Sequence, residues 1–184
     1  MNYPHFKYHP NAYILNIFEK EDGICSICHE KRELKYNCSF YSIDTPDYIC
    51  PWCIENGAAA KLYQGSFNDD MGIENTEFID DDEIVNVLYP ITDEFVDQIC
   101  HRTPSYASWQ QQVWLIHCDE PCQFINYATS KLLHPILHEV LEDIENSNIP
   151  LEWIQHHLTI DSDFSAYLFQ CIHCGKHRLH LDSC

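Results

Sequence analysis

Cys25-Ser26-Ile27-Cys28 and Cys50-Pro51-Trp52-Cys53 are the two stretches that decide the fold. In each stretch two residues separate the cysteines, a spacing that turns both sulfurs toward one centre while backbone amides of the turn donate to them. Two such pairs complete a closed tetrahedron with no open position for a substrate. The sequence therefore predicts a structural zinc site formed by Cys25, Cys28, Cys50 and Cys53.

The main rival interpretation is a thioredoxin-type redox pair formed by Cys50 and Cys53. That interpretation leaves the matching upstream pair without a role, and the βαβ pattern that it requires is not apparent. Cys38 lies inside the loop between the pairs and is expected to be a small buried residue or a spare thiol.

A second, looser set of cysteines follows in the second half of the chain. Three residues separate Cys118 from Cys122, two separate Cys171 from Cys174, and Gly175 stands where such a turn often needs a positive φ. The nearby histidines His117, His173 and His177 are alternative ligands, and one of them could replace a cysteine or leave a fourth position open. We predict a second Zn²⁺ here, against the alternative of ordinary buried cysteines beside surface histidines.

Composition places the chain in a reducing compartment. Its 184 residues are 45% hydrophobic, enough to fill a core without disulfides, and the eleven cysteines are odd in number and concentrated in close pairs. No apolar stretch is long enough for a membrane span, and no secretion signal is apparent. We expect a cytoplasmic protein without membrane contact.

The expected fold class is α+β. A small zinc-binding domain, with treble-clef or zinc-ribbon-like knuckles, is fused to a mixed α/β core as one compact unit. Its parts are an N-terminal arm and zinc-knuckle region (1–68), an acidic segment (69–101) and a mixed α/β region with the second zinc site (102–184). Patterning predicts helices after Cys53 and over 92–100 and 150–158, and strands over 109–118 and 166–171. It also predicts an amphipathic helix in the stretch 130–145, which Pro135 places as starting around Leu133 or His134.

Charge constrains the partner. The net charge of −19 argues against a nucleic-acid binder, which needs Lys and Arg to neutralise phosphates, and favours a basic protein partner. Lys and Arg are absent between Lys61 and Arg102, and Asp80, Asp81, Asp82 and Glu83 are the expected contact residues. The alternative is that this segment is only a solvated loop.

Several strings together resemble one family. They are Phe6-Lys7-Tyr8-His9-Pro10, Ile49-Cys50-Pro51-Trp52-Cys53-Ile54, Phe67-Asn68-Asp69, Arg102-Thr103-Pro104, Trp109-Gln110-Gln111, His117-Cys118 and Tyr167-Leu168-Phe169-Gln170-Cys171-Ile172-His173-Cys174-Gly175-Lys176. In this order the strings are similar to the bacterial CbrC family. The chain departs from that pattern in having His29 rather than glycine after Cys28, and Asn126 where a glycine is often found.

The resemblance implies a role in colicin tolerance or toxin immunity and supplies no catalytic residues. We therefore expect a binding protein rather than an enzyme, one that neutralises a toxin of the basic nuclease type through an acidic surface. One alternative is a zinc enzyme with an open second site, where His117 or His173 flanks a metal-bound water and Asp119 or Glu120 is the catalytic carboxylate. Another is a cytosolic adaptor for a different protein.

Overall fold

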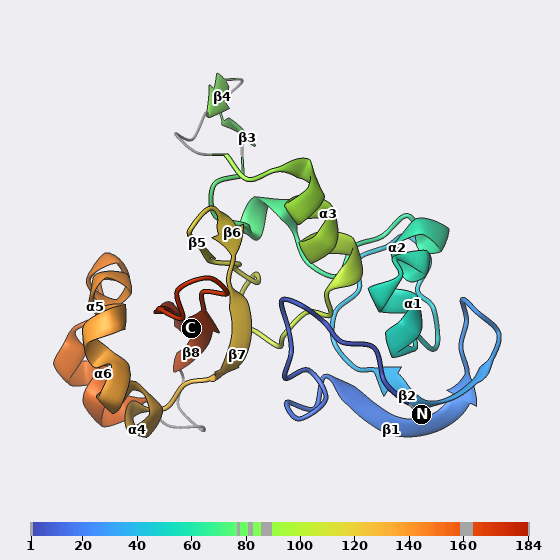
Figure 1. Cartoon of the computed structure of the whole chain (residues 1–184), viewed down its shortest axis with the longest axis horizontal. Coiled ribbons are helices and arrows are strands. Elements are labelled where there is room, and N and C mark those ends of the chain that lie inside the picture. The colour runs from blue at the N-terminus through green and yellow to red at the C-terminus, as the bar shows by residue number, and fades with distance from the viewer. Residues whose placement is uncertain (1, 77, 81–82, 86–89, 159–163, 184) are drawn as a thin grey trace.

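The computed structural model describes residues 2–76, 78–80, 83–85, 90–158 and 164–183. Figure 1 shows a mixed α/β chain, with one group of strands and short helices at the N-terminal end, a small sheet near the middle and a layer of helices at the far end. Within the described residues, no helix combines the length and apolar character needed to cross a membrane.

The N-terminal part is an antiparallel hairpin with two short helices beside it. Strand β1 (Phe18–Ile24) pairs with β2 (Lys31–Tyr36), and α1 (Pro51–Glu55) is followed by α2 (Ala58–Tyr63). Gly57 separates the two helices with a φ of 74°, a conformation that glycine adopts without steric cost. Their core is drawn from the arm, the hairpin, the helices and Phe67, and it includes the buried cysteines Cys25, Cys50 and Cys53.

A three-stranded antiparallel sheet forms the middle of the second half, in the order β7 (Gln123–Tyr127), β8 (Phe164–Gln170) and β9 (His177–Ser183). Its central strand β8 is buried on both faces because its side chains alternate between two cores. Phe164, Ala166 and Leu168 belong to the core shared with the helices, whereas Tyr167 and Phe169 join an aromatic core on the other face.

The helical layer consists of α4 (Ser130–Leu133), the 3-10 turn η2 (His134–Ile136), α5 (Leu137–Asn146) and α6 (Leu151–His157). The amphipathic helix predicted to start around Leu133 or His134 is instead divided around Pro135, which lacks an amide hydrogen and crowds the preceding turn, and α5 starts at Leu137. Its apolar face is nevertheless placed as expected, since Leu133, Val140 and Ile144 are buried against the sheet.

The two halves are linked by η1 (Asp70–Gly72), β3 (Phe78–Asp80), β4 (Glu83–Val85), α3 (Asp93–Arg102), β5 (Ile116–His117) and β6 (Glu120–Pro121). Helix α3 begins after Thr92 as the sequence predicts. The predicted strand over 109–118 is mostly wrong, because only Ile116 and His117 pair in a strand. Trp114 is buried there and makes a single bridge with Ile73. The domain boundaries at 68 and 101 stay a prediction.

Candidate metal centres

The first cysteine tetrad is assembled by the N-terminal hairpin and α1. Cys25 and Cys28 lie in the turn between β1 and β2, whereas Cys50 is the N-cap of α1 and Cys53 lies in its first turn. Proline suits position 51 because an amide hydrogen in the first turn of a helix has no acceptor within the helix, so its absence costs nothing. The structure therefore brings together all four cysteines that the sequence predicts.

The sulfur separations in this tetrad fit a tetrahedral metal ion. The Sγ atoms of Cys25 and Cys53 are 3.8 Å apart, and those of Cys28 and Cys50 are 3.9 Å apart. Four sulfurs at the usual zinc–sulfur distance define a tetrahedron with edges of about 3.8 Å. A disulfide would require about 2.05 Å, so these are free thiols arranged as metal ligands are. The first tetrad could hold a metal ion.

Arg32 covers the most accessible sulfur of this tetrad. Its Nη2 lies 3.9 Å from Cys28 Sγ, and its guanidinium stacks 4.3 Å from the centre of the Trp52 ring. A metal ion with four thiolates carries a net negative charge, which a neighbouring guanidinium offsets. Arg32 also pairs with Glu30 at 2.8 Å, which helps to hold the guanidinium in place.

A second tetrad consists of His117, Cys118, Cys171 and Cys174, whose ligand atoms all lie within 4.8 Å of one another. His117 and Cys118 come from the β5–β6 hairpin, and Cys171 and Cys174 from the turn between β8 and β9. Cys118 and Asp119 form the tip of the first hairpin with φ values of 55° and 58°. Positive φ at both central residues is typical of the tight turn that joins two twisted strands.

The distances in the second tetrad also fit a tetrahedral ion. The Sγ atoms of Cys118 and Cys174 are 3.9 Å apart, and His117 Nδ1 lies 3.2 Å and 3.5 Å from these two sulfurs. An edge between a sulfur and an imidazole nitrogen around zinc is about 3.5 Å. Three cysteines and one histidine could therefore hold a metal ion here.

Cys122, predicted as a ligand of this site, lies outside the tetrad. Its side chain is fully buried in the aromatic core, and burial raises the pKa of its thiol to about 12. The spacing of Cys118 and Cys122 suggested a knuckle, but the chain turns at Cys118 and Asp119, and β6 then leads Cys122 away from the tip. His117 occupies the fourth position instead, as one of the alternatives considered from sequence.

The other two candidate histidines bind carboxylates. His173 Nε2 lies 2.5 Å from Glu120 Oε2, and His177 Nδ1 lies 3.0 Å from Glu139 Oε2. Glu120 is also bound by Lys7 and by the Tyr8 hydroxyl. Burial raises the pKa of Glu120, but Lys7 and these hydrogen bonds outweigh it and keep the pKa below its usual value. The carboxylate is thus ionised and already held by three partners.

The knuckles at Cys25 and Cys171 share one backbone pattern. The Cys25 amide donates to the Glu30 carbonyl at 3.0 Å, and the His29 amide donates to the Cys25 carbonyl at 2.9 Å. The corresponding bonds from Cys171 to Lys176 and from Gly175 to Cys171 measure 2.9 Å and 3.1 Å. His29 has a φ of 58° and Gly175 one of 75°, so both turns need a left-handed residue at the same place.

The amides inside the second knuckle act directly on a sulfur. Burial raises the pKa of the Cys171 thiol, but the Cys174 amide and the His117 side chain outweigh it and bring the pKa to about 6. Cys38 and Cys100, which belong to neither tetrad, behave in the opposite way. Burial raises their pKa values to about 11 and about 12, so they are neutral thiols at physiological pH.

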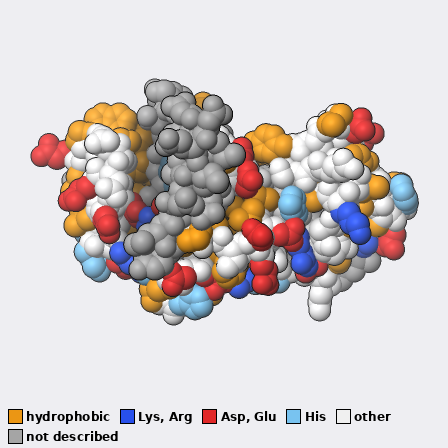
Figure 2. Space-filling view, turned by 90° about the horizontal axis from the view of Figure 1, so that it is seen from above, with side chains coloured by type: hydrophobic (Ala, Val, Ile, Leu, Met, Phe, Trp, Pro, Cys, Tyr) orange, Lys and Arg blue, Asp and Glu red, His pale blue; other side chains and the backbone are white. Residues whose placement is uncertain are grey.

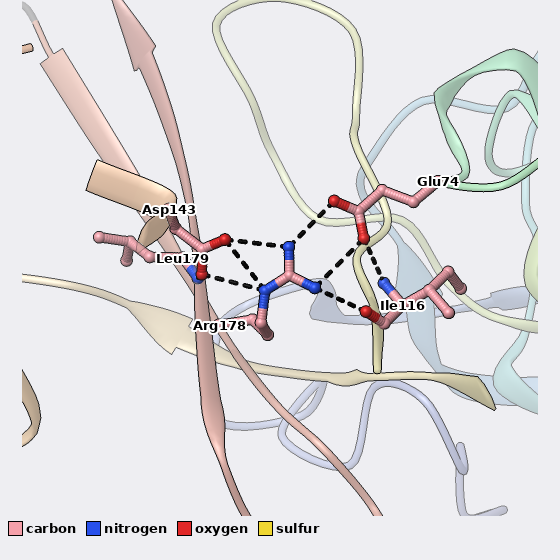
Figure 3. Close-up of polar contacts among 5 residues, drawn as sticks. All are labelled: Glu74, Ile116, Asp143, Arg178 and Leu179. Atoms are coloured by element: carbon pink, nitrogen blue, oxygen red, sulfur yellow. Dashed lines mark hydrogen bonds and ion pairs between the residues drawn. The ribbon is translucent and has the colours of Figure 1, made fainter. Parts of the chain in front are cut away.

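A half-buried arginine fixes the two halves of the second tetrad relative to each other (Figure 3). Arg178 in β9 donates from Nε to both oxygens of Asp143 at 3.0 Å, and from Nη2 to Glu74 Oε1 at 3.0 Å. Glu74 Oε2 accepts from the Ile116 amide at 2.7 Å, directly before His117 in β5. The charged cluster of Arg178, Glu74 and Asp143 thereby joins β5 to the sheet. No sequence motif predicts this cluster.

Acidic side chains gather on the linking elements. We call the set on η1 and α3 the acidic face: Asp69, Asp70, Asp93, Glu94 and Asp97. Four of these carboxylates are exposed and the fifth, on the Asp69 cap of η1, is half-buried. Asp69 and Asp70 line a groove of about 410 Å³ together with Val96 and His101 of α3, so the two elements border one depression. In Figure 2 acidic side chains lie together near the middle of one face of the molecule.

The four residues predicted for partner binding lie next to this face along the chain. Asp80 ends β3 and Glu83 begins β4, where the two are opposite each other in the pairing register. Asp81 and Asp82 lie outside the described residues. The contact assignment for all four stays a prediction.

A comparison with known families decides where the chain belongs. The model of the family described as "Uncharacterised protein family (UPF0167)" matches residues 3–183. The chain belongs to the UPF0167 family. A UPF0167 protein of Pseudomonas aeruginosa is 31% identical over 190 residues, which cover 97% of this chain and 96% of that protein. The CbrC name expected from the sequence stays a prediction.

Relatives of the UPF0167 family also occur in other bacteria. UPF0167 proteins of Mycobacterium bovis and Mycobacterium tuberculosis are each 27% identical over 187 residues, covering 97% of this chain and 92% of theirs. No solved structure matches the chain. The similarity therefore extends over nearly the whole chain.

Proposed function

We propose that the chain is a zinc-stabilised binding protein that captures a basic protein through its acidic face, in the manner of a bacterial immunity protein. The observation that carries this proposal is the acidic face itself. Five carboxylates stand at η1 and on α3, and two of them, Asp69 and Asp70, line the groove that the two elements border. They lie in a segment without Lys or Arg from 62 to 101, on a chain with a net charge of −19. Such a surface attracts cationic partners and repels nucleic acid.

Zinc is the ion that we assign to both tetrads. Thiolates and imidazole are the ligands that zinc prefers, and sets of four cysteines or of three cysteines with one histidine are typical of closed structural sites. The first tetrad joins a hairpin turn to the start of a helix, and we assign it to the treble-clef type on that basis. The role of both ions is to hold a small mixed fold rigid.

A nuclease-type toxin is the partner class that we favour. The substrate groove of a nuclease is rich in Lys and Arg because it binds phosphates, so an acidic protein can associate quickly and block the groove. The resemblance to the CbrC family points to the same class. The β3–β4 segment with Asp80, Asp81, Asp82 and Glu83 extends the acidic face in this proposal.

A binding role accounts for the metal centres better than a catalytic role. Each tetrad offers four protein ligands, whereas catalytic zinc keeps one position for water or substrate. Glu120, considered above as the catalytic carboxylate, is bound by Lys7, Tyr8 and His173. Asp119, the other candidate, lies at the hairpin tip.

The proposal is tested by isolating partners of the tagged protein at low salt after nuclease treatment, with candidate basic toxins supplied. Affinity for any partner is then measured for Asp93→Asn/Glu94→Gln/Asp97→Asn. We expect these three changes to weaken binding at least about tenfold, because each removes a carboxylate that attracts the cationic partner. A second variant that neutralises Asp80, Asp81, Asp82 and Glu83 tests the neighbouring segment.

The matched control is Glu142→Gln/Glu145→Gln/Glu152→Gln, which removes the same charge from exposed positions on α5 and α6. With affinity measured at about 0.1 M salt, it should leave affinity within about twofold, since charges beyond a Debye length of about 10 Å are then largely screened. If both variants weaken binding equally, net charge rather than the acidic face carries the interaction. Binding that persists in both variants would remove the proposal.

A further inference from the structure

The two metal centres differ in how far water reaches their sulfurs. In the first tetrad Cys25, Cys50 and Cys53 are 0%, 0% and 2% exposed, and Arg32 covers the fourth sulfur. In the second tetrad Cys171 is 3% exposed, but Cys118 and Cys174 are both exposed. The cysteine sulfurs are therefore shielded in the first tetrad, whereas two of the three in the second are open to solvent.

The two exposed sulfurs are also neighbours. Cys118 Sγ lies 3.9 Å from Cys174 Sγ, and each contacts His117 Nδ1. Within the described part of the chain, the hydrogen bonds of these two sulfurs go only to members of the same tetrad. Unlike Cys28, neither has a guanidinium over it among those contacts. A small oxidant can approach either sulfur from solvent.

We propose that Cys118 and Cys174 form an oxidation site at which a peroxide converts the thiolate pair into a disulfide and releases the second zinc ion. The inference rests on the zinc assignment made above for the second tetrad, and it does not depend on the partner. It gives the chain a reversible modification site that the shielded first centre lacks.

The reaction balances with peroxide as the oxidant. One thiolate attacks a peroxide oxygen, the O–O bond breaks, and a sulfenic acid and hydroxide form. The second thiolate attacks the sulfenic sulfur, the S–S bond forms, and a second hydroxide leaves. Two protons from solvent convert both hydroxides to water, so the sulfur pair loses two electrons and peroxide gains them. Zinc loses two of its four ligands and leaves, with His117 and Cys171 remaining.

The fold around the site tolerates this change. Arg178 holds Ile116 and Asp143 together through contacts that do not pass through the metal, so β5 stays attached to the sheet. The sulfurs lie at two hairpin turns, where a small shift brings them from 3.9 Å to bonding distance. Oxidation is therefore expected to alter the tips of the two turns and leave the three cores intact.

The test uses the purified full chain with both metals bound. Native mass spectrometry first counts the metal ions, and hydrogen peroxide is then added in the presence of a zinc-binding dye. We expect one zinc ion to be released at least about tenfold faster than the other, since exposure controls thiolate oxidation. Peptide mapping should find a Cys118–Cys174 disulfide and a mass loss of two hydrogens. Thiol reductant with zinc should restore the original count.

Two comparisons identify the responsible sulfurs. Cys122→Ala removes a nearby buried thiol and should leave the release unchanged, whereas Arg32→Met uncovers Cys28 and should speed release from the first centre only. Release of both ions at equal rates, or a disulfide that maps elsewhere, would overturn the proposal. If the chain is isolated with a single zinc ion, the assignment of zinc to the second tetrad is contradicted. If peroxide also fails to link Cys118 to Cys174 in that protein, the proposed oxidation site is contradicted as well.

Discussion

Arg178 Nη1 donates to the backbone carbonyl of Ile116 at 2.6 Å, so the cation that pairs Glu74 with Asp143 also fixes the residue before a metal ligand. Burial alone lowers the pKa of Arg178, but the two carboxylates outweigh it and raise the pKa above its usual value. The guanidinium therefore stays charged. It connects the helical layer, the sheet and the β5–β6 hairpin at one point.

Replacing this arginine tests that connection. Arg178→Met should lower the free energy of unfolding by about 3 kcal/mol, because the Asp143 carboxylate is left buried without its cation. Metal content should fall by the ion of the second centre, and the first should be retained. Urea unfolding and native mass spectrometry measure both effects. Lys35→Met, which breaks an exposed pair with Glu21, is the control and should cost less than about 1 kcal/mol.

The ligand sets predict which cysteines carry metal. Cys171→Ala should remove one ion from the protein and Cys25→Ala the other, because each change deletes one of the four protein ligands that a closed structural zinc site uses. Cys122→Ala should keep both ions and lose about 1 kcal/mol of stability from the small cavity left in the core. Metal analysis of the purified variants decides the matter. Loss of an ion from Cys122→Ala would restore Cys122 as a ligand.

Metal removal should unfold the N-terminal part first. Cys25, Cys50 and Cys53 belong to its hydrophobic core, so without the ion their sulfurs lose the attraction that holds the hairpin to α1. We expect a chelator to abolish amide protection in β1, β2 and α1 while the β7–β8–β9 sheet keeps most of its protection. Hydrogen exchange measured by mass spectrometry distinguishes the two regions. Uniform loss of protection would show that the cores unfold together.

The shared knuckle geometry predicts that two glycine exchanges affect stability differently. His29→Gly removes the backbone strain of a left-handed non-glycine residue, but it also makes the unfolded chain more flexible. Because these two effects oppose each other, the free energy of unfolding should change by no more than about 1 kcal/mol. Gly175→Ala should destabilise by about 1 kcal/mol for the same backbone reason. Space is available at Gly175, since an added Cβ would meet nothing nearer than 4.0 Å. Thermal unfolding of the two variants gives the sign.

Acid should destabilise the fold through His9. Its ring is fully buried, Nδ1 lies 2.8 Å from the Pro104 carbonyl, and burial lowers its pKa from 6.5 to about 4. Between pH 6.5 and about pH 4, His9 is therefore protonated in the unfolded chain but neutral in the folded chain. The free energy of unfolding falls as the pH is lowered across this window. The loss from this residue between about pH 7.5 and pH 5 should be about 2 kcal/mol.

His9→Asn isolates this contribution, because its amide can donate in place of Nδ1 and does not titrate. Urea unfolding of both proteins at the two pH values separates His9 from the metal ligands, which are common to both. The stability difference between the proteins should narrow or reverse on acidification. A difference independent of pH would mean that His9 is not held neutral.

The sequence predicts those structural features that are marked by motifs or caps within a few neighbouring residues. The first tetrad, α3 beginning after Thr92, α6 after Pro150 and β8 before Cys171 all follow from motifs or caps contained in a few residues. The mixed α/β fold class also follows from such local patterns. Treble-clef geometry and bound zinc remain proposals.

The remaining features depend on contacts between distant segments. Whether His117 or Cys122 completes the second tetrad is decided by the turn at Cys118 and Asp119, and spacing alone does not reveal that turn. Trp114 suggested a strand but is buried in an irregular segment. Its indole Nε1 donates to the Cys122 carbonyl. Arg178, Glu74 and Asp143 lie far apart in sequence, so nothing local marks their association.

The order of the ligands along the chain sets the order in which the two centres can assemble. Cys25 and Cys53 are 28 residues apart, whereas Cys118 and Cys174 are 56 apart. The longer loop costs only about 0.6 kcal/mol more to close, so closure entropy hardly separates the centres. Vectorial synthesis does separate them, because the first centre has all its ligands once Cys53 emerges and the second must wait for Cys174. During translation, the first tetrad could therefore bind an ion before any residue of the second tetrad has been made.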